Sequence, residues 1–520
     1  MPKVFKNKIV FDKDDWMASL APDYSTSRIS KIGNGLAFVR SFNPYRNLGY
    51  ASPGFMPTDL TNVAVVDAAQ IKAEVNGTFA YTIGGTKIQQ ITIATNAITT
   101  PTTFPKTIAH GAHTSIAGQD LCVYYTNISS TRTKMLFYAF NDNTDGDIGT
   151  YDFTTTFDDD WMSTVPTDGA VLTKTTPKRL IVGHDDTMYI SDGNLVKGFD
   201  GATGTNGTFL GTVLTLPKDY IITGFVKTEP RMLVVFAYKD QSDAFNRGKV
   251  TVFFWNYLDA DIYKGVDIND NYVDAAFDYN GVPACFTQGN PTGSSLNRSS
   301  RLQIYDGIGF KAVTDFKGDA PVHGGVEVTG NMIRWASKGV IYSYSNPFFH
   351  SQAIPIGMNI LGEGTGTSRG LLKTISGTTT ILSSGTTTSG GLQNVSSNYY
   401  FQSIVATALA QPNFDVRKIG HIEYVKIKFK GTATGGRNVL VQLYDSTQSL
   451  GEVIGSAENL KEITSSNVTL LRDKTITGAT YTDFDELRAV VSWGSGIAAT
   501  DAPIVDTIEV FFSTKTLNIS

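Results

Sequence analysis

The sequence predicts an all-β protein: an irregular β-propeller, with an extended N-terminal arm before it and a C-terminal β-sandwich of jelly-roll or immunoglobulin-like type after it. A hairpin phrase returns at intervals of about fifty residues, which is typical of propellers and related arrays. Sustained apolar spacing of the helical kind is absent. The last part of the chain contains short segments in which apolar and polar residues alternate, as in half-buried antiparallel strands.

The repeated phrase is a hydrophobic strand, a short turn of Gly, Asn or Asp, and a second hydrophobic strand. Its copies lie at residues 78–93, 121–140, 188–201, 231–256, 301–313 and 334–345. A single hairpin cannot bury its apolar face alone, so the copies must stack against one another. We therefore predict a propeller-like domain over residues 57–361, with about six or seven blades. Part of the segment that follows could complete the last blade.

The predicted domain boundaries follow changes in composition. Residues 1–56 are an arm in which Gly, Pro and Asn interrupt any regular ladder. Residues 362–398 are a linker rich in Gly, Thr and Ser. Residues 399–520 form the predicted sandwich. Within it, the alternation of His421–Gly431 places Ile422 on the same face as Tyr424, and Val425 on the opposite face.

Composition excludes several functional classes. The 520 residues are 41% hydrophobic and 11% aromatic, as in a folded globular protein, with a net charge of −5. No stripe of Lys and Arg is present, so we expect no direct nucleic-acid binding. No apolar run is long enough for a membrane helix, so we expect no membrane insertion. The two cysteines, Cys122 and Cys285, lie among apolar residues and are expected to be buried free thiols.

A candidate metal site lies at residues 141–152, NDNTDGDIGTYD. Read as a twelve-residue calcium loop, the segment places Gly146 at the sharp turn and oxygen ligands around it. The candidate ligands of a structural Ca²⁺ ion are Asn141, Asn143, Asp145, Asp147 and Asp152. The first position is Asn, the last is Asp rather than Glu, and the flanks are strands, so a plain polar hairpin turn is the alternative. No other cofactor is required.

The remaining reactive side chains give no catalytic constellation, and we expect the chain not to be an enzyme. His110 and His113 form an isolated pair; zinc needs further ligands, which neighbouring residues do not supply, so the default is a surface or interface role. Hydrolysis of glycosides needs two carboxylates that face each other across a cleft. The sequence does not show such a distance, and acidic residues in loops are most simply explained as side chains in contact with water. The acids considered are Asp158, Asp159, Asp160, Asp259, Asp261 and Asp267.

A short acidic phrase around a tryptophan occurs twice. FDKDDWM at residues 11–17 is echoed by FDDDWM at residues 157–162. The echo has two explanations: two acidic turns that each bury a tryptophan, or a duplicated docking element. In the second case Trp16 and Trp161 anchor interfaces with a partner, as aromatic side chains often do.

The order of arm, blades, linker and sandwich resembles the virion proteins of tailed bacteriophages. An aromatic residue followed by Asp-Gly, as in Phe199–Gly201 and Tyr305–Gly307, is common in phage propeller proteins, as is a turn such as Ser52–Asn62 before the first blade. The segment Phe414–Gly431 is similar to the strand pair that follows the last blade in tail-nozzle and tail-tip proteins.

The resemblance implies a structural component of a phage tail, such as a nozzle, hub or tip protein, made in the host cytoplasm and located in the virion. Its implied partners are other copies of itself, as a homo-oligomer, and other virion proteins. One alternative is a carbohydrate-binding adhesin or receptor-binding protein, in which Trp493 and Tyr481 stack on host-surface glycans. A weaker alternative is a propeller glycosidase.

Overall fold

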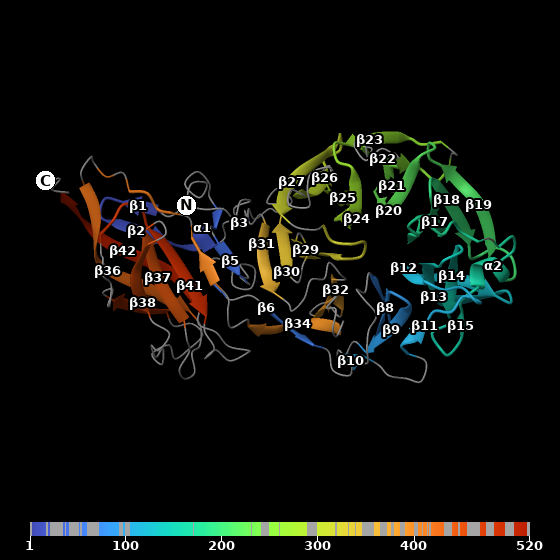
Figure 1. The fold of residues 1–520 in the computed structure, drawn as a ribbon, viewed down its shortest axis with the longest axis horizontal. Helices are drawn as coiled ribbons and strands as arrows, with labels where there is room; N and C mark the ends of the chain where they lie inside the picture. The colour runs from blue at the N-terminus through green and yellow to red at the C-terminus, as the bar shows by residue number, and fades with distance from the viewer. Residues whose placement is uncertain are drawn as a thin grey trace. The chain divides into compact units, whose positions relative to one another are not determined.

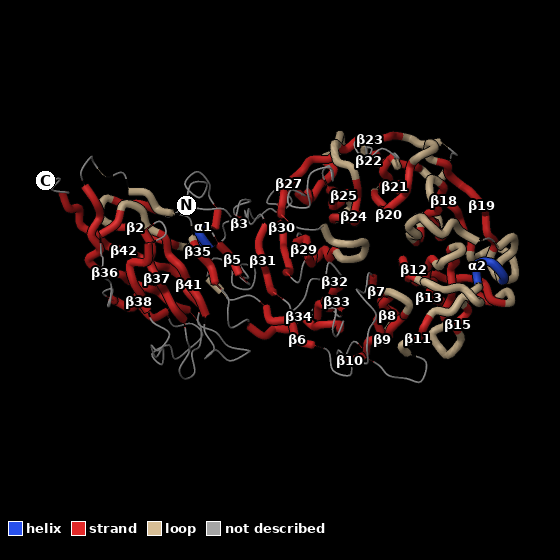
Figure 2. The backbone as a smooth tube through the Cα atoms, viewed as in Figure 1, coloured by secondary structure: helices blue, strands red, loops and turns tan. Residues whose placement is uncertain are grey.

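A computed structural model gives the fold of this chain. It describes residues 3–16, 19–20, 35–36, 38–40, 51–52, 55–59, 72–92, 97–98, 104–169, 171–229, 231–240, 249–258, 261–288, 299–317, 320–330, 332–337, 340–345, 358–363, 372–375, 379–384, 391–399, 404–407, 409–412, 414, 418–430, 439–445, 448–454, 469–474, 483–493 and 504–516. Strands dominate these residues, and the two helices among them have one turn each (Figure 2). None of the helices in the described ranges is long and apolar enough to cross a membrane.

The chain divides into two compact units. We call Thr58–Gly339 with Thr365–Asn394 the propeller unit, and Met1–Pro57 with Val340–Gly364 and Val395–Ser520 the sandwich unit. The predicted all-β class, a propeller with a sandwich, is confirmed by the antiparallel sheets of the two units. Because the predicted domain boundaries are not tested by these observations, they stay predictions.

The propeller unit is built from successive antiparallel sheets (Figure 1). Their strands are β7 (Lys72–Asn76), β8 (Phe79–Gly84), β9 (Lys87–Thr92), β10 (Ala97–Ile98) and β11 (Lys106–Thr107); β12 (Ala117–Ile128), β13 (Thr131–Asn141), β14 (Gly146–Tyr151) and β15 (Phe157–Asp158); β16 (Leu180–Val182), β17 (Met188–Asp192), β18 (Leu195–Asp200) and β19 (Thr208–Thr215); β20 (Tyr220–Thr228), β21 (Met232–Lys239), β22 (Val250–Trp255) and β23 (Lys264–Ile268); β24 (Tyr272–Tyr279), β25 (Val282–Gln288), β26 (Ser299–Tyr305) and β27 (Phe310–Lys317). Two hairpins come next, β28 (Val326–Thr329) with β29 (Met332–Ser337), and β32 (Leu372–Ile375) with β33 (Thr379–Ser384).

The first strands of these sheets form a closed ring. In the described part of the unit, β7 contacts β12, and the contacts continue through β16, β20, β24, β28 and β32 back to β7. A ring of first strands is the arrangement that lets each blade bury its faces against two neighbours. The sheets that begin with β7, β12, β16, β20 and β24 are called blades 1 to 5.

The core between blades is aromatic. Between blades 2 and 3, Trp161 on α2 (Trp161–Thr164) contacts Phe137 and Phe199 edge to face, with ring centroids 5.1 and 5.0 Å apart. Between blades 1 and 2, Tyr81 and Tyr151 pack in a second cluster. Aromatic side chains bury large areas and favour such tilted contacts, so these clusters fix each blade to the next.

The aromatic-Asp-Gly phrase occupies the same place in two blades. Asp200 and Asp306 each end or follow the third strand, and each side chain accepts hydrogen bonds from backbone N–H groups of the turn after it. At Gly201 a Cβ atom would lie 2.3 Å from the carbonyl oxygen of Tyr125, so only glycine fits this close approach. The aromatic-Asp-Gly phrase therefore forms the same kind of turn, stabilised by the Asp side chain, in both blades.

Besides the short pairings of β3 (Ser19–Leu20) with β4 (Gly35–Leu36) and of β30 (Val340–Ser345) with β31 (Met358–Glu363), the sandwich unit contains two larger sheets. One has the order β1 (Lys3–Phe5), β2 (Lys8–Phe11), β42 (Ile504–Thr516), β36 (Lys418–Lys430) and β39 (Thr469–Lys474), with β40 (Asp483–Phe484) on β36. The other has the order β38 (Gln448–Ile454), β37 (Val439–Asp445), β41 (Arg488–Trp493), β35 (Ile404–Ala406) and β5 (Phe38–Arg40). Apolar side chains of both sheets, such as Ile427 and Val491, are fully buried.

Residues at the N-terminus belong to this sandwich. The hairpin β1–β2 pairs with β42, with Phe11 opposite Ile508. After it, α1 (Lys13–Trp16) buries the Trp16 indole, whose Nε1–H donates to the carbonyl oxygen of Asp506 at 2.7 Å. This part of the predicted arm therefore completes a sheet of its own chain.

The predicted faces of β36 differ from the observed ones at two neighbouring positions, Ile422 and Glu423; Glu423 is exposed, although strict alternation places it on the face of Val425. Ile422 is buried together with Val425 and Ile427, although strict alternation places it with exposed Tyr424. The pairing with β42 shifts register between Ile422 and Tyr424, and this bulge turns Ile422 to the buried face. The prediction for Ile422 was wrong because an inserted residue is invisible to a period of two.

Candidate metal centre

Two loops of the propeller unit bring histidines and aspartates together. His110 and His113 follow β11, which pairs with β9 in blade 1. Asp142 and Asp145 lie in the turn between β13 and β14 of blade 2. Backbone hydrogen bonds hold the two loops side by side, since the Asn143 N–H donates to the Thr114 carbonyl and the Thr114 N–H donates to the Asn143 side chain.

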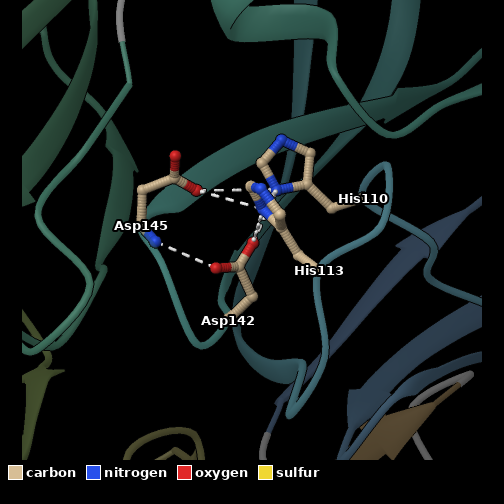
Figure 3. Close-up of side chains that lie close together, drawn as sticks. All are labelled: His110, His113, Asp142 and Asp145. Carbon is tan, nitrogen blue, oxygen red and sulfur yellow. Dashed lines mark hydrogen bonds and ion pairs between the residues drawn. The ribbon is translucent and has the colours of Figure 1, made fainter.

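The four side chains converge on one point (Figure 3). Nδ1 of His110 and Nδ1 of His113 lie 2.6 and 2.8 Å from the same oxygen, Oδ2 of Asp142. The two nitrogens are 3.0 Å apart. Oδ1 of Asp145 lies 3.5 Å from the first nitrogen and 3.7 Å from the second. One donor atom from each residue thus lies within 4.8 Å of the other three.

Hydrogen bonds stabilise the ionised form of the Asp142 carboxylate. Its Oδ1 accepts the backbone N–H groups of Thr144 and Asp145 at 2.6 and 2.9 Å. Burial opposes ionisation, but the hydrogen bonds from His110 and from these two N–H groups outweigh it and hold the pKa of Asp142 well below its usual range. Asp142 is therefore ionised at every ordinary pH.

Two more carboxylates lie behind His110. Its Nε2 is 3.0 Å from Oδ1 of Asp160 and 3.6 Å from Oδ2 of Asp147. The Asp147 side chain is fully buried, and burial raises its pKa to about 7. For His110 itself, burial opposes the charged form, but Asp142, Asp147 and Asp160 outweigh it and raise the pKa.

The structure does not gather the five predicted calcium ligands into one set. Asp145 enters the histidine cluster, and Asp147 lies behind it. Asn143 is bonded to Thr114, and Asn141 ends β13 with its Nδ2 donating to the Thr176 carbonyl. Because 146–151 form strand β14, Asp152 lies at the far end of that strand, where it accepts N–H groups of its own turn. Calcium binding stays a prediction.

The sequence contains a pattern that could have indicated this cluster, although the two histidines were interpreted as an isolated pair. His110 and His113 are three residues apart, and an acidic turn follows one strand pair later. The additional donor atoms near the two histidines belong to that turn, to Asp142 and Asp145, and strand pairing rather than proximity in sequence brings them there.

A second buried ionic group lies inside the ring of first strands. Asp120 on β12 is fully buried, and its carboxylate meets Lys72 Nζ at 2.7 Å and His323 Nε2 at 3.0 Å. The Leu121 and Leu180 backbone N–H groups complete its hydrogen bonds. Burial opposes the charge, but Lys72 outweighs it, so the pKa of Asp120 is well below its usual range. A cavity of about 200 Å³ beside this group is lined by Lys72, Arg179 and His323 among apolar residues.

The His323 imidazole predicts a pH dependence of stability. Burial and the nearby Arg179 charge lower its pKa from 6.5 to about 4. Between these pH values the unfolded chain binds one proton more than the folded chain, so stability falls on acidification. The variant His323→Gln keeps a hydrogen-bond donor for Asp120 but cannot bind this proton. We expect it to lose about 2 kcal/mol less free energy of unfolding than wild type between pH 6.5 and pH 5. Urea unfolding at both pH values measures this.

The control for that experiment is His184→Gln, which changes a partly buried histidine of blade 3. It should leave the wild-type pH profile unchanged. An equal acid sensitivity of His323→Gln and wild type would contradict the role given to His323.

The tryptophans, the tyrosine and the cysteines singled out from sequence lie inside the protein or outside the described residues. Trp16 and Trp161 are 0% and 2% exposed, and Trp493 is 2% exposed. Their observed contacts are internal, and a role of the first two at an interface stays a prediction. Tyr481 lies outside the described residues. Both cysteines are buried and unpaired.

Comparisons with known proteins give similarity of fold alone. No family model matches the chain, and neither does any curated protein. Among solved structures, an exo-beta-1,3-galactanase from Phanerochaete chrysosporium with galactose is 14% identical over 88% of this chain and 100% of its own, with a TM-score of 0.35. The structure of the Dos1 propeller is 11% identical over 70% of this chain and 91% of its own, with a TM-score of 0.39.

One expectation from sequence is corrected by these comparisons. We expected the chain not to be an enzyme, but the galactanase among the similar structures is a glycosidase, and the exclusion does not stand. At TM-scores below 0.5 the likeness assigns no activity or substrate to this chain.

Proposed function

We propose that this chain is a structural component of a tailed-phage particle, a tail nozzle, hub or tip protein that works by contact with neighbouring virion proteins. The phrases that resemble phage propeller proteins support the proposal, since Phe199–Gly201 and Tyr305–Gly307 sit at equivalent blade turns. The combination of a propeller unit with a sandwich unit also supports it.

The observation that carries the proposal is an exposed apolar surface on blades 4 and 5. Leu258, Tyr263 and Ile308 are 87%, 74% and 83% exposed. The first two lie in the β22–β23 loop, and the third lies in the β26–β27 turn. We call these three residues the apolar rim. Large apolar side chains gathered on neighbouring loops mark sites of protein contact, because water solvates them poorly.

Lys264 connects the two loops of the apolar rim. Its Nζ donates to the Tyr305 hydroxyl at 2.9 Å and to the Ile308 carbonyl at 3.4 Å. The same ammonium group lies 5.3 Å from the centre of the Tyr305 ring, at the distance of a cation–π contact. Lys264, which follows Tyr263 in the chain, therefore ties the end of the β22–β23 loop to the turn that carries Ile308.

The apolar rim can be tested without unfolding the protein. In the double variant Leu258→Ser with Ile308→Ser, both changes affect exposed side chains, so stability should stay within about 0.5 kcal/mol per change. Incorporation into phage particles should fall by tenfold or more, because contact anchors contribute about 1 kcal/mol or more each. Quantitative mass spectrometry of purified particles measures the copies per particle.

The matched control is Val171→Ser with Leu210→Ser, two exposed apolar residues elsewhere on the propeller unit, 53% and 46% exposed. This variant should be incorporated like wild type. If the variant with Leu258→Ser and Ile308→Ser were incorporated normally, the apolar rim would not be a contact surface, and the proposal would lose its main support.

A further inference from the structure

We propose that the propeller unit binds one divalent transition-metal ion of the zinc class through Nδ1 of His110, Nδ1 of His113, Oδ2 of Asp142 and Oδ1 of Asp145. The inference is independent of the proposed function. It depends on the geometry of four donor atoms from two loops, and on two buried carboxylate oxygens of the cluster, Oδ1 of Asp145 and Oδ2 of Asp147, that have no hydrogen-bond partner among the described residues.

The spacing of the donor atoms fits a tetrahedral site. Zinc binds nitrogen and carboxylate oxygen at about 2.0–2.2 Å, which places tetrahedral ligands about 3.3 Å apart. The distances from the two histidine nitrogens to each other and to the two oxygens run from 2.6 to 3.7 Å and bracket that value. Small movements of the His110 and Asp142 side chains bring all of them to bonding distance.

The two nitrogens of the His110 ring face different groups. Nδ1 lies 2.6 Å from Oδ2 of Asp142 and 3.0 Å from Nδ1 of His113, while Nε2 lies 3.0 Å from Oδ1 of Asp160 and 3.6 Å from Oδ2 of Asp147. A histidine that binds a metal through one nitrogen usually donates the N–H of the other nitrogen to a carboxylate. The surroundings of His110 provide both: donor atoms at Nδ1 and carboxylates at Nε2.

Unpartnered oxygens support the same conclusion. Oδ2 of Asp147, on a fully buried side chain, and Oδ1 of Asp145 are buried atoms without a hydrogen-bond partner among the described residues. Buried carboxylates are costly unless a cation or a donor compensates them. A divalent ion at the four-donor point compensates Asp145 directly, and Asp160 and Asp147 orient the ligand His110 from behind.

The donor set favours zinc over calcium. Two imidazole nitrogens suit zinc and its transition-metal neighbours, whereas calcium prefers six to eight oxygens. Four protein ligands close a tetrahedral site, which is typical of a structural metal. Such an ion would tie the loop after β11, from blade 1, to the β13–β14 turn of blade 2. The His113 side chain is 31% exposed, so the site is open to metal from solvent.

The test uses the full chain, stripped with chelator and titrated with Zn²⁺. We expect about one zinc per chain by elemental analysis, a higher Tm with Zn²⁺, and no comparable shift with Ca²⁺. Co²⁺ as a substitute probe should give the intense visible absorption of a four-coordinate site. No stoichiometric zinc, or an equal response to Ca²⁺, would overturn the proposal; the histidines would then serve only as hydrogen-bond partners of the aspartates.

Three variants locate the ion. His113→Gln removes a partly exposed ligand and should weaken zinc binding by more than 100-fold, while Asp160→Asn removes an outer carboxylate partner of His110 and should weaken it by about 10–100-fold. His421→Gln, beside Asp483 in the sandwich unit, is the matched control and should bind zinc like wild type. Far-ultraviolet circular dichroism of each variant without metal confirms folding. Wild-type zinc affinity in folded His113→Gln would overturn the assignment.

Discussion

Replacement of Asp120 by Asn is expected to lower the free energy of unfolding of the propeller unit by about 3–5 kcal/mol, because it leaves the Lys72 ammonium group without its main charge partner. Lys72 lies 2.7 Å from the Asp120 carboxylate, and the remaining acid, Glu74, is 3.6 Å away. Denaturant unfolding followed by near-ultraviolet circular dichroism measures the loss.

A rescue variant tests the cause of that loss. Lys72→Met combined with Asp120→Asn removes the orphaned charge and should recover part of the stability. Asp186→Asn is the matched control: its pair with Arg132 is exposed, and its loss should cost at most about 1 kcal/mol. A cost below about 1 kcal/mol for Asp120→Asn would show that the buried pair does not stabilise the ring.

The second large effect is expected at Trp161. Its indole packs between Phe137 and Phe199, so Trp161→Ala should lower the free energy of unfolding by about 3–5 kcal/mol through lost contacts and the cavity that remains. Leu210→Ala, at a partly exposed position of β19, is the control and should cost far less. Thermal and denaturant unfolding of the purified variants measure both.

The same variant separates the two explanations of the tryptophan echo. If Trp161 is a core residue, the isolated protein loses stability. If it anchors an interface, the isolated protein keeps its stability and only assembly suffers. Unchanged stability of Trp161→Ala would therefore contradict the packing described for blades 2 and 3.

Local patterns were sufficient to predict the fold class. The hairpin phrases at 121–140 and 231–256 became paired strands, β12 with β13 and β21 with β22, because alternation and turn residues act over short distances. Long-range pairing was not predictable in the same way. The pairing of β2 with β42 joins the two ends of the chain, and no local pattern specifies that partner.

The candidate metal centre shows the same limit. The sequence identified Asp145 and the pair His110 and His113, but in separate hypotheses. They meet because β11 joins blade 1 while the β13–β14 turn belongs to blade 2, and because the backbones of Asn143 and Thr114 are bonded. A ligand set assembled across two blades depends on the register of strands, which composition and spacing do not contain.

The most direct test of the proposed function is the location of the chain in phage particles. Cryo-electron microscopy of purified particles from the lysate that contains this protein should show its propeller and sandwich units in several copies on the tail, with the apolar rim at Leu258, Tyr263 and Ile308 covered by a neighbouring protein. A protein found outside the particles as a free monomer, with this surface exposed, would contradict the account and direct the search to glycan binding and hydrolysis.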